Sequence, residues 1–158
     1  MGTVMDARGP IHGAAPLPGE NSATDTTADR SVGMPRPGPV CVIDDDPAVR
    51  DSLTMLLETF GFSVLTFGSG AEFLSEEQRH NKGFLIVDQH MPGLDGLATL
   101  AALQNTGTPA PAVLITGRID PGIAERATKF GVIAILEKPF ATAQLVELVR
   151  ASLEQRDD

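Results

Sequence analysis

Reactive side chains stand at the ends of four short apolar runs in this sequence. Asp44 and Asp45 follow the first apolar run, Asp88 follows the third, Thr116 closes the fourth, and Lys138 comes shortly after the fifth. If these ends meet, three carboxylates share one site, and they cannot all stay ionised without a counter-charge. Mg²⁺ takes carboxylate oxygens together with waters and a phosphate oxygen, so such a site suits this cation.

The same set of groups is suited to phosphoryl transfer. A carboxylate can act as the nucleophile toward a phosphoryl group, which gives an aspartyl phosphate. Because the transferring group carries negative charge spread over its oxygens, a metal ion, an ammonium and a hydroxyl donor around it favour the reaction. Asp88 is the best candidate for the nucleophile, because it stands alone at the end of a predicted central strand.

The elements that must position these groups alternate regularly from residue 39 onward. Short apolar runs predict strands, and amphipathic segments with apolar residues three or four positions apart predict a helix after each strand. The predicted strands are 39–43, 62–67, 83–88, 111–117 and 132–136. The predicted helices are 47–60, 69–80, 94–104, 121–130 and 141–155. The inner face of the first helix is predicted to comprise Val49, Leu53, Leu56, Leu57 and Phe60.

Near-continuous apolar strands that alternate with helices predict an α/β fold, with a parallel sheet covered by helices on both faces. For five such units with right-handed crossovers, we expect the doubly wound, flavodoxin-like strand order 2-1-3-4-5. Strand 2 then lies at an edge, and the ends of the other four strands are neighbours. Because ligands of such sheets bind beyond the carboxyl ends of the strands, the reactive groups are expected to meet in one shallow pocket.

Asp46, the third consecutive aspartate, has a different predicted role. Pro47 follows it at the first helical position, where a missing N–H costs nothing. Asp46 is therefore interpreted as the N-cap of this helix. Asp95 is interpreted in the same way, as the local cap of the helix near residues 94–104.

The first 38 residues differ in composition from the rest of the chain. They hold five of the 12 prolines and six of the 16 glycines, and none of the seven phenylalanines. Such a segment cannot bury enough apolar surface to offset the entropy of ordering it. Residues 1–38 are therefore predicted to be a disordered tail and residues 39–156 a single domain, with no output domain after it. The tail lacks the apolar run of a signal peptide.

Composition argues against several classes of protein. No stretch approaches 18 apolar residues, so no membrane span is expected. Residues 39–158 carry 17 acidic and nine basic side chains, which argues against direct nucleic-acid binding. The three histidines lack the spacing of metal ligands, so a zinc site is not expected. The single Cys41 is consistent with a reducing cytoplasm.

Four stretches, in this order, closely resemble the receiver domain of two-component response regulators, the chemotaxis CheY-like superfamily: VIDDDPAVR, LIVDQHMPGLDGL, VLITG and EKPF. Each motif alone is weak. Their separations of 43 residues from Asp45 to Asp88, 28 to Thr116 and 22 to Lys138 make the combination specific. The resemblance runs from about residue 39 to 155, and with no output domain expected it is to the single-domain type.

The resemblance implies a role for individual residues. Asp88 would be the phosphoacceptor, Thr116 the switch hydroxyl that moves to the phosphoryl group, and Lys138 the lysine that contacts this group. The Lys138–Pro139 peptide bond would be cis. The implied ligands of Mg²⁺ are Asp44, Asp45, Asp88 and the backbone carbonyl of His90.

The implied function is that of a signalling module more than an enzyme. A stand-alone response regulator would take a phosphoryl group from a phosphohistidine on a sensor histidine kinase or a histidine phosphotransfer protein. It would need Mg²⁺, act in the cytoplasm and lose the group slowly by hydrolysis. Its output would be contact with a downstream protein that the sequence does not identify. The resemblance also allows a homodimer through the face formed by the last two helices and the strand between them.

Two local features bear on this expected function. Ile135 stands where the family commonly carries a Tyr or Phe that swings inward when the threonine moves. We therefore hypothesise that Ile135 alters the size of the conformational response without abolishing phosphorylation. His90 and Arg118, each two residues past a predicted site residue, are predicted to tune water access to the phosphoryl group.

Two other functions stay open. A pseudo-receiver would be a constitutive protein-binding module, and Ile135 keeps this alternative open. A haloacid-dehalogenase-like phosphatase would use Asp44 and Asp46 as nucleophile and acid. It would leave Asp88 without a role, and the sequence after Lys138 offers no acidic pair at a strand end for the metal.

Overall fold

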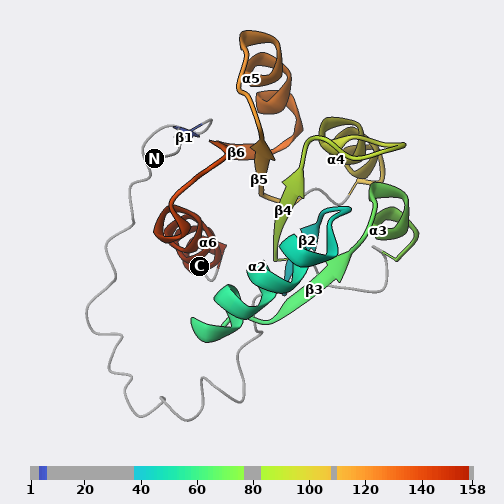
Figure 1. The fold of residues 1–158 in the computed structure, drawn as a ribbon. Helices are drawn as coiled ribbons and strands as arrows, with labels where there is room; N and C mark the ends of the chain where they lie inside the picture. The colour runs from blue at the N-terminus through green and yellow to red at the C-terminus, as the bar shows by residue number, and fades with distance from the viewer. Residues whose placement is uncertain (1–3, 7–37, 77–82, 108–109, 157–158) are drawn as a thin grey trace, which may run out of the picture.

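The computed structural model describes residues 4–6, 38–76, 83–107 and 110–156, which form alternating strands and helices (Figure 1). The strands are β1 (Val4–Asp6), β2 (Val40–Ile43), β3 (Val64–Phe67), β4 (Phe84–Asp88), β5 (Ala112–Thr116) and β6 (Val132–Glu137). The helices are α2 (Pro47–Thr59), α3 (Gly70–Glu76), α4 (Gly96–Asn105), α5 (Pro121–Ala127), the 3₁₀ turn η3 (Thr128–Phe130) and α6 (Thr142–Arg156). Within these ranges, no helix is long and apolar enough to cross a membrane.

The strands form one sheet in the order β1-β6-β5-β4-β2-β3. Strands β2 to β6 all run parallel to one another. Numbered from β2, their order is 2-1-3-4-5, so the predicted flavodoxin-like fold is confirmed. The carboxyl ends of β2, β4, β5 and β6 therefore lie side by side, as the sequence predicts.

Strand β1 was not predicted. Val4–Asp6 falls inside the segment that the composition assigns to a disordered tail, and that prediction is wrong for these three residues, because they pair antiparallel with β6. The outer edge of β6 offers backbone N–H and C=O groups, and an edge of this kind is a template for a further strand. The rest of the predicted tail up to residue 37 lies outside the described residues.

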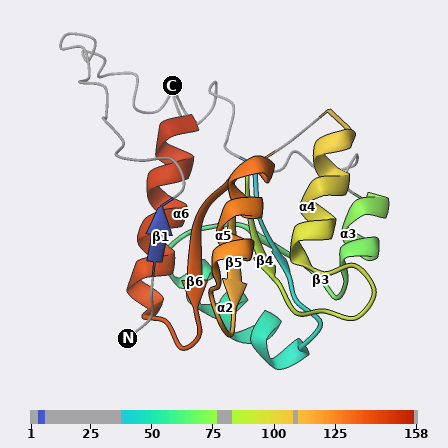
Figure 2. The ribbon, with the colours of Figure 1, turned by 90° about the horizontal axis from the view of Figure 1, so that it is seen from above.

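Helices cover both faces of the sheet: α2 and α6 lie on one face, and α3, α4 and α5 lie on the other (Figures 1 and 2). Successive side chains of a strand point to opposite faces. Along β2, Cys41 and Ile43 pack with the α3–α5 layer, while Val40 and Val42 pack with α2 and α6. Because both faces are buried, the strands are apolar throughout rather than alternating.

The first predicted helix ends one residue earlier than expected. The helix predicted at 47–60 ends at Thr59, and Phe60 is its C-cap residue. Phe60 is 49% exposed instead of buried with the inner face, because the chain leaves the helical path there. Its ring lies 5.9 Å from the guanidinium carbon of Arg150. The helix predicted at 69–80 is present as α3, and residues 77–80 lie outside the described part.

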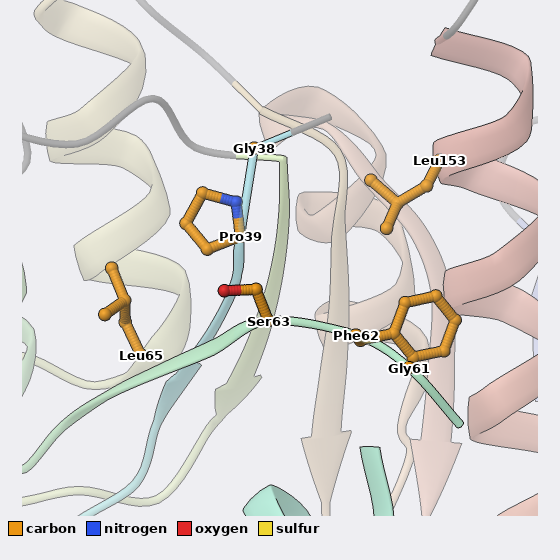
Figure 3. A pocket seen from close by; sticks show the side chains of 7 residues that line it. All are labelled: Gly38, Pro39, Gly61, Phe62, Ser63, Leu65 and Leu153. Carbon is orange, nitrogen blue, oxygen red and sulfur yellow. The ribbon is translucent and has the colours of Figure 1, made fainter. Parts of the chain in front are cut away.

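A pocket of about 390 Å³ lies at the end of the sheet where the parallel strands begin (Figure 3). It is lined by Gly38, Pro39, Gly61, Phe62, Ser63, Leu65 and Leu153. These lining residues include no titratable side chain, so this pocket offers little for catalysis. The reactive groups lie at the opposite end, where the strands finish.

Candidate functional site

Two neighbouring strands bring the acidic residues together. Asp44 follows β2, Asp88 is the last residue of β4, and these strands pair in parallel with Ile43 opposite Val87. Carboxylate oxygens of Asp44, Asp45 and Asp88 all lie within 4.8 Å of one another. The strand-end pattern thus becomes a compact acidic cluster at the carboxyl edge of the sheet.

The three carboxylates differ in burial. Asp44 and Asp88 are each 4% exposed, whereas Asp45 is exposed to solvent. Burial raises the pKa of the Asp44 carboxyl above its usual value, and the nearby charges of Asp88 and Asp45 act in the same direction. The backbone N–H of Asp46 and the charge of Lys138 oppose this rise in the pKa. The net effect is a site that favours an added positive charge.

Lys138 supplies one positive charge to the cluster. It follows directly after β6 and is joined to Pro139 by a cis peptide bond, as predicted, and its Nζ lies 3.1 Å from Oδ1 of Asp88. The ammonium is partly exposed, while the carboxylate is buried. Among the described residues, the buried Oδ1 of Asp88 has no hydrogen-bond partner apart from this ion pair.

The run of three aspartates divides between the site and the helix. The Asp44 carboxylate accepts a hydrogen bond of 2.9 Å from the backbone N–H of Asp46. Asp46 itself accepts one of 3.0 Å from the Ala48 N–H and caps α2, as predicted. Its exposed carboxylate is thus used at the helix terminus, which disfavours the phosphatase alternative in which Asp46 is the catalytic acid. Arg50 fixes the same turn by donating to the Asp44 carbonyl over 2.7 Å.

Thr116 is fully buried at the end of β5, and its hydroxyl contacts the residues predicted to flank the phosphoryl group. The hydroxyl donates to the carbonyl of Arg118 over 3.1 Å and accepts from the N–H of Arg118 over 3.2 Å. The Nε2 of His90 lies 3.2 Å from the same oxygen. Thr116 is therefore held at the strand end by His90 and Arg118, a contact that the sequence alone did not indicate.

The loop after Asp88 is fixed by residues to which sequence analysis gave no role in the site. The buried side chain of Gln89 accepts a hydrogen bond of 2.9 Å from the Leu97 N–H, and its backbone carbonyl accepts from Gly96. A Cβ added at Gly96 would lie 2.7 Å from the Asp88 carbonyl oxygen. The close approach of α4 to Asp88 therefore requires glycine at residue 96. The Asp95 carboxylate caps α4 through the Ala98 N–H, as predicted.

A hollow of about 480 Å³ lies directly beside the acidic cluster, between α2 and the connection from β6 to α6. Asp44 and Lys138 form its polar end, and most of the remaining wall is apolar. The wall is completed by Ala48, Val49, Ser52, Leu53, Ile115, Pro139, Phe140 and Thr142. The reactive groups are thus open to a partner of considerable size on this side.

The donor set fits Mg²⁺. All three side chains offer carboxylate oxygens, which this hard cation prefers. Asp45 is open to solvent, so waters can complete the coordination, and the buried Oδ1 of Asp88 has no described partner apart from the Lys138 ammonium. A bound dication would also offset the burial and the charge repulsion that raise the pKa of Asp44.

The fold and the site together define a flavodoxin-like α/β protein with an acidic, cation-suited pocket where the parallel strands end. The family model described as "Response regulator receiver domain" matches residues 40–150, and this chain belongs to that family. Receiver domains are signalling phosphoacceptors that bind Mg²⁺ at an acidic pocket, and the cluster of Asp44, Asp45 and Asp88 provides such a pocket here.

Named relatives agree with this assignment. The chain is 42% identical over 120 residues to the transcriptional regulatory protein FixJ of Azorhizobium caulinodans, covering 76% of this chain and 57% of that protein. It is 35% identical over 115 residues to the response regulator protein TodT of Pseudomonas putida, covering 73% and 51%. The crystal structure of FixJ-N superposes with a TM-score of 0.69 at 31% identity, over 77% of this chain and 96% of that one. The chain thus spans only part of the length of these two curated relatives.

Proposed function

We propose that this protein accepts a phosphoryl group on Asp88 from a phosphohistidine and signals through the conformational change that follows. The contact that carries this proposal is the 3.1 Å ion pair between Lys138 Nζ and Asp88 Oδ1, inside the cluster that also contains Asp44 and Asp45. An aspartate that is buried, paired with a lysine and flanked by two further carboxylates is suited to nucleophilic attack on phosphorus.

Each neighbour has a distinct task in this proposal. Asp44, Asp45, Asp88 and the backbone carbonyl of His90 would hold Mg²⁺, which supplies positive charge where negative charge builds up on the phosphoryl oxygens. Lys138 stays with the phosphoryl oxygens after the transfer, and the Thr116 hydroxyl leaves Arg118 to donate to them. During the transfer, the bond between phosphorus and the imidazole nitrogen of the phosphohistidine breaks as the bond between phosphorus and an Asp88 oxygen forms.

The proposed donor is a sensor histidine kinase or a histidine phosphotransfer protein in the cytoplasm. The apolar hollow beside Asp44 and Lys138 supports this, because a protein that carries phosphohistidine needs a surface next to the acceptor. Its output would be contact with a downstream protein, and a homodimer through the α5–β6–α6 face is part of the proposal. The protein promotes its own phosphorylation and dephosphorylation and turns over no separate substrate.

The decisive experiment incubates the full chain with Mg²⁺ and acetyl phosphate and follows the mass of the intact protein. We expect one added phosphoryl group on the wild type and none on Asp88→Asn. Omitting Mg²⁺ is the second arm and should greatly slow the reaction. No adduct on the wild type would refute phosphoacceptor function, and an adduct on Asp88→Asn would refute the assignment of the site.

A further inference from the structure

The outer edge of β6 lacks the usual protection of an edge strand. Residues Val132–Leu136 are all apolar and buried, and the first charged side chain of the strand is Glu137. Charged side chains and prolines blunt many exposed edges, and this run carries neither. The side chains of β3, the strand at the opposite edge, are less buried than those of β6. Thr66 is exposed, and Val64 and Leu65 are only half-buried.

Strand β1 occupies this edge in the structure. Val4 pairs with Leu136, Met5 with Ile135 and Asp6 with Ala134, all in antiparallel register. Figure 1 shows β1 beside β6. The pairing adds one antiparallel strand to an otherwise parallel sheet, so the first described segment of the chain covers its last strand.

The direction of the backbone N–H groups along β6 indicates which of them is hydrogen-bonded to β1. The N–H of Lys138 donates to the Thr116 carbonyl on β5. Because N–H groups alternate in direction along a strand, the amide of Leu136 also points to β5, while that of Ile135 points outward, toward Met5. Antiparallel partners of this kind exchange both hydrogen bonds, so Met5 and Ile135 form the central pair of the contact.

The pairing of β1 with β6 is short and is separated from the parallel sheet by a long connection, so another strand can replace it. It involves three residues, and residues 7–39 lie between β1 and the first strand of the parallel sheet. Ordering a short strand and closing a long stretch of chain both oppose the pairing. Recognition through backbone groups also makes few demands on the sequence of the added strand. A second copy of β6 could pair with the same edge about a two-fold axis.

We propose that the outer edge of β6 is a strand-binding site, that Val4–Asp6 is its intramolecular ligand, and that this ligand keeps a second copy of the chain from pairing there. The β6 edge lies within the α5–β6–α6 face, so the N-terminal strand controls access to the surface where a homodimer would form. The competition with a second copy rests on the homodimer of the proposed function, whereas the strand-binding site itself does not depend on phosphorylation of Asp88.

The test compares Met5→Pro with Met5→Val in the full chain. Proline removes the backbone N–H of residue 5, which bonds to Ile135, and locks its φ at about −65°, away from the extended values of a strand. Valine keeps both backbone groups and favours strands. Amide hydrogen exchange is measured by NMR, and the dimer dissociation constant is measured by sedimentation, both without a phosphodonor. The Leu136 amide, directed to β5, is the internal reference.

We expect Met5→Pro to raise the exchange rate of the Ile135 amide about ten-fold or more, with Leu136 unchanged, and to tighten self-association by a similar factor. Met5→Val should match the wild type in both. A synthetic peptide of residues 3–7, added to Met5→Pro, should restore protection of Ile135 and reverse the self-association.

Equal Ile135 exchange in the proline and valine variants would overturn the strand-binding site. Faster exchange with unchanged self-association would overturn the competition with a second copy.

Discussion

His90 and Thr116 contact each other where β4 and β5 end, with Nε2 3.2 Å from the hydroxyl oxygen. The same hydroxyl is bonded to the backbone of Arg118 at both its N–H and its carbonyl. The hydroxyl that the proposed function requires at the phosphoryl group is thus engaged elsewhere before phosphorylation. His90 and Arg118 are both exposed, and the contact of His90 with the hydroxyl is made by its side chain.

Replacing both flanking side chains should shorten the lifetime of the aspartyl phosphate. In His90→Ala with Arg118→Ala, the backbone contacts of Thr116 remain possible, but the two bulky exposed groups predicted to limit water access to the phosphoryl group are lost. We expect hydrolysis about ten-fold faster, which corresponds to roughly 1.4 kcal/mol of barrier. Loss of the added phosphoryl mass over time measures it, with Arg126→Ala on α5 as the control. An unchanged hydrolysis rate in the double variant would contradict this role.

The raised pKa of Asp44 predicts a pH-dependent cost in stability. Its folded pKa lies above its unfolded value, so the native state binds the proton more tightly. The contribution of Asp44 to the free energy of unfolding is therefore greatest at low pH and falls as the pH rises through its folded pKa. Without Mg²⁺, Asp44→Asn should be more stable than the wild type at pH 7, and this difference should shrink toward pH 4.

Urea unfolding across this pH range measures the effect, and Mg²⁺ provides the matching control. The cation favours the ionised carboxyl, so it should stabilise the wild type at pH 7 and narrow the gap to Asp44→Asn. A wild type that is more stable than Asp44→Asn at pH 7 without Mg²⁺ would show that Asp44 is not under electrostatic strain.

Alanine variants of Asp45 and Asp46 should have different effects, because Asp45 is proposed to bind the metal and Asp46 caps a helix. Asp46 accepts the Ala48 N–H at the start of α2, so Asp46→Ala should lower the free energy of unfolding by about 1 kcal/mol. Phosphorylation by acetyl phosphate should be largely retained. Asp45→Ala should weaken Mg²⁺ binding, seen as a higher Mg²⁺ concentration for half-maximal phosphorylation, without this loss of stability. If Asp46→Ala weakens Mg²⁺ binding and Asp45→Ala lowers the stability instead, these roles of the two aspartates are wrong.

Much of this architecture can be predicted because its causes are local. Strands buried on both faces read as apolar runs, and a run of five β–α units permits few topologies. Asp46 could be predicted as a cap because Pro47 marks the first helical position. The acidic cluster then follows, because parallel strands end at one edge of the sheet.

What could not be predicted depends on contacts between distant segments. Val4–Asp6 has no distinctive pattern, and only the free edge of β6 makes a strand of it. The contact of His90 with Thr116 joins two side chains from different strand ends, so neither neighbourhood in the sequence indicates it. Phe60 fits the apolar period of α2 but lies past the last helical residue, where the period no longer sets direction.

Ile135 should limit the response of β6 to phosphorylation. Its side chain is 1% exposed and is enclosed by the core on the α3–α5 side. We therefore expect a phosphoryl mimic to shift the NMR signals of Asp88, Thr116 and Lys138 strongly and those of the Ile135 methyl groups weakly. A rearrangement of Ile135 as large as that of Thr116 would contradict this expectation.

Gly96 should be required for the position of Asp88. A Cβ at this residue would lie 2.7 Å from the Asp88 carbonyl oxygen and 2.8 Å from a methyl group of Leu114. Relieving these contacts must move α4 away from β4, at a cost of about 1–3 kcal/mol. Gly96→Ala should therefore lose this stability in urea unfolding and also slow phosphorylation, because the shift displaces the acceptor. Gly117→Ala is the matched control, since a Cβ there meets no atom within 4 Å and the stability should change little. Equal stability of the two variants would show that α4 can adjust without disturbing Asp88.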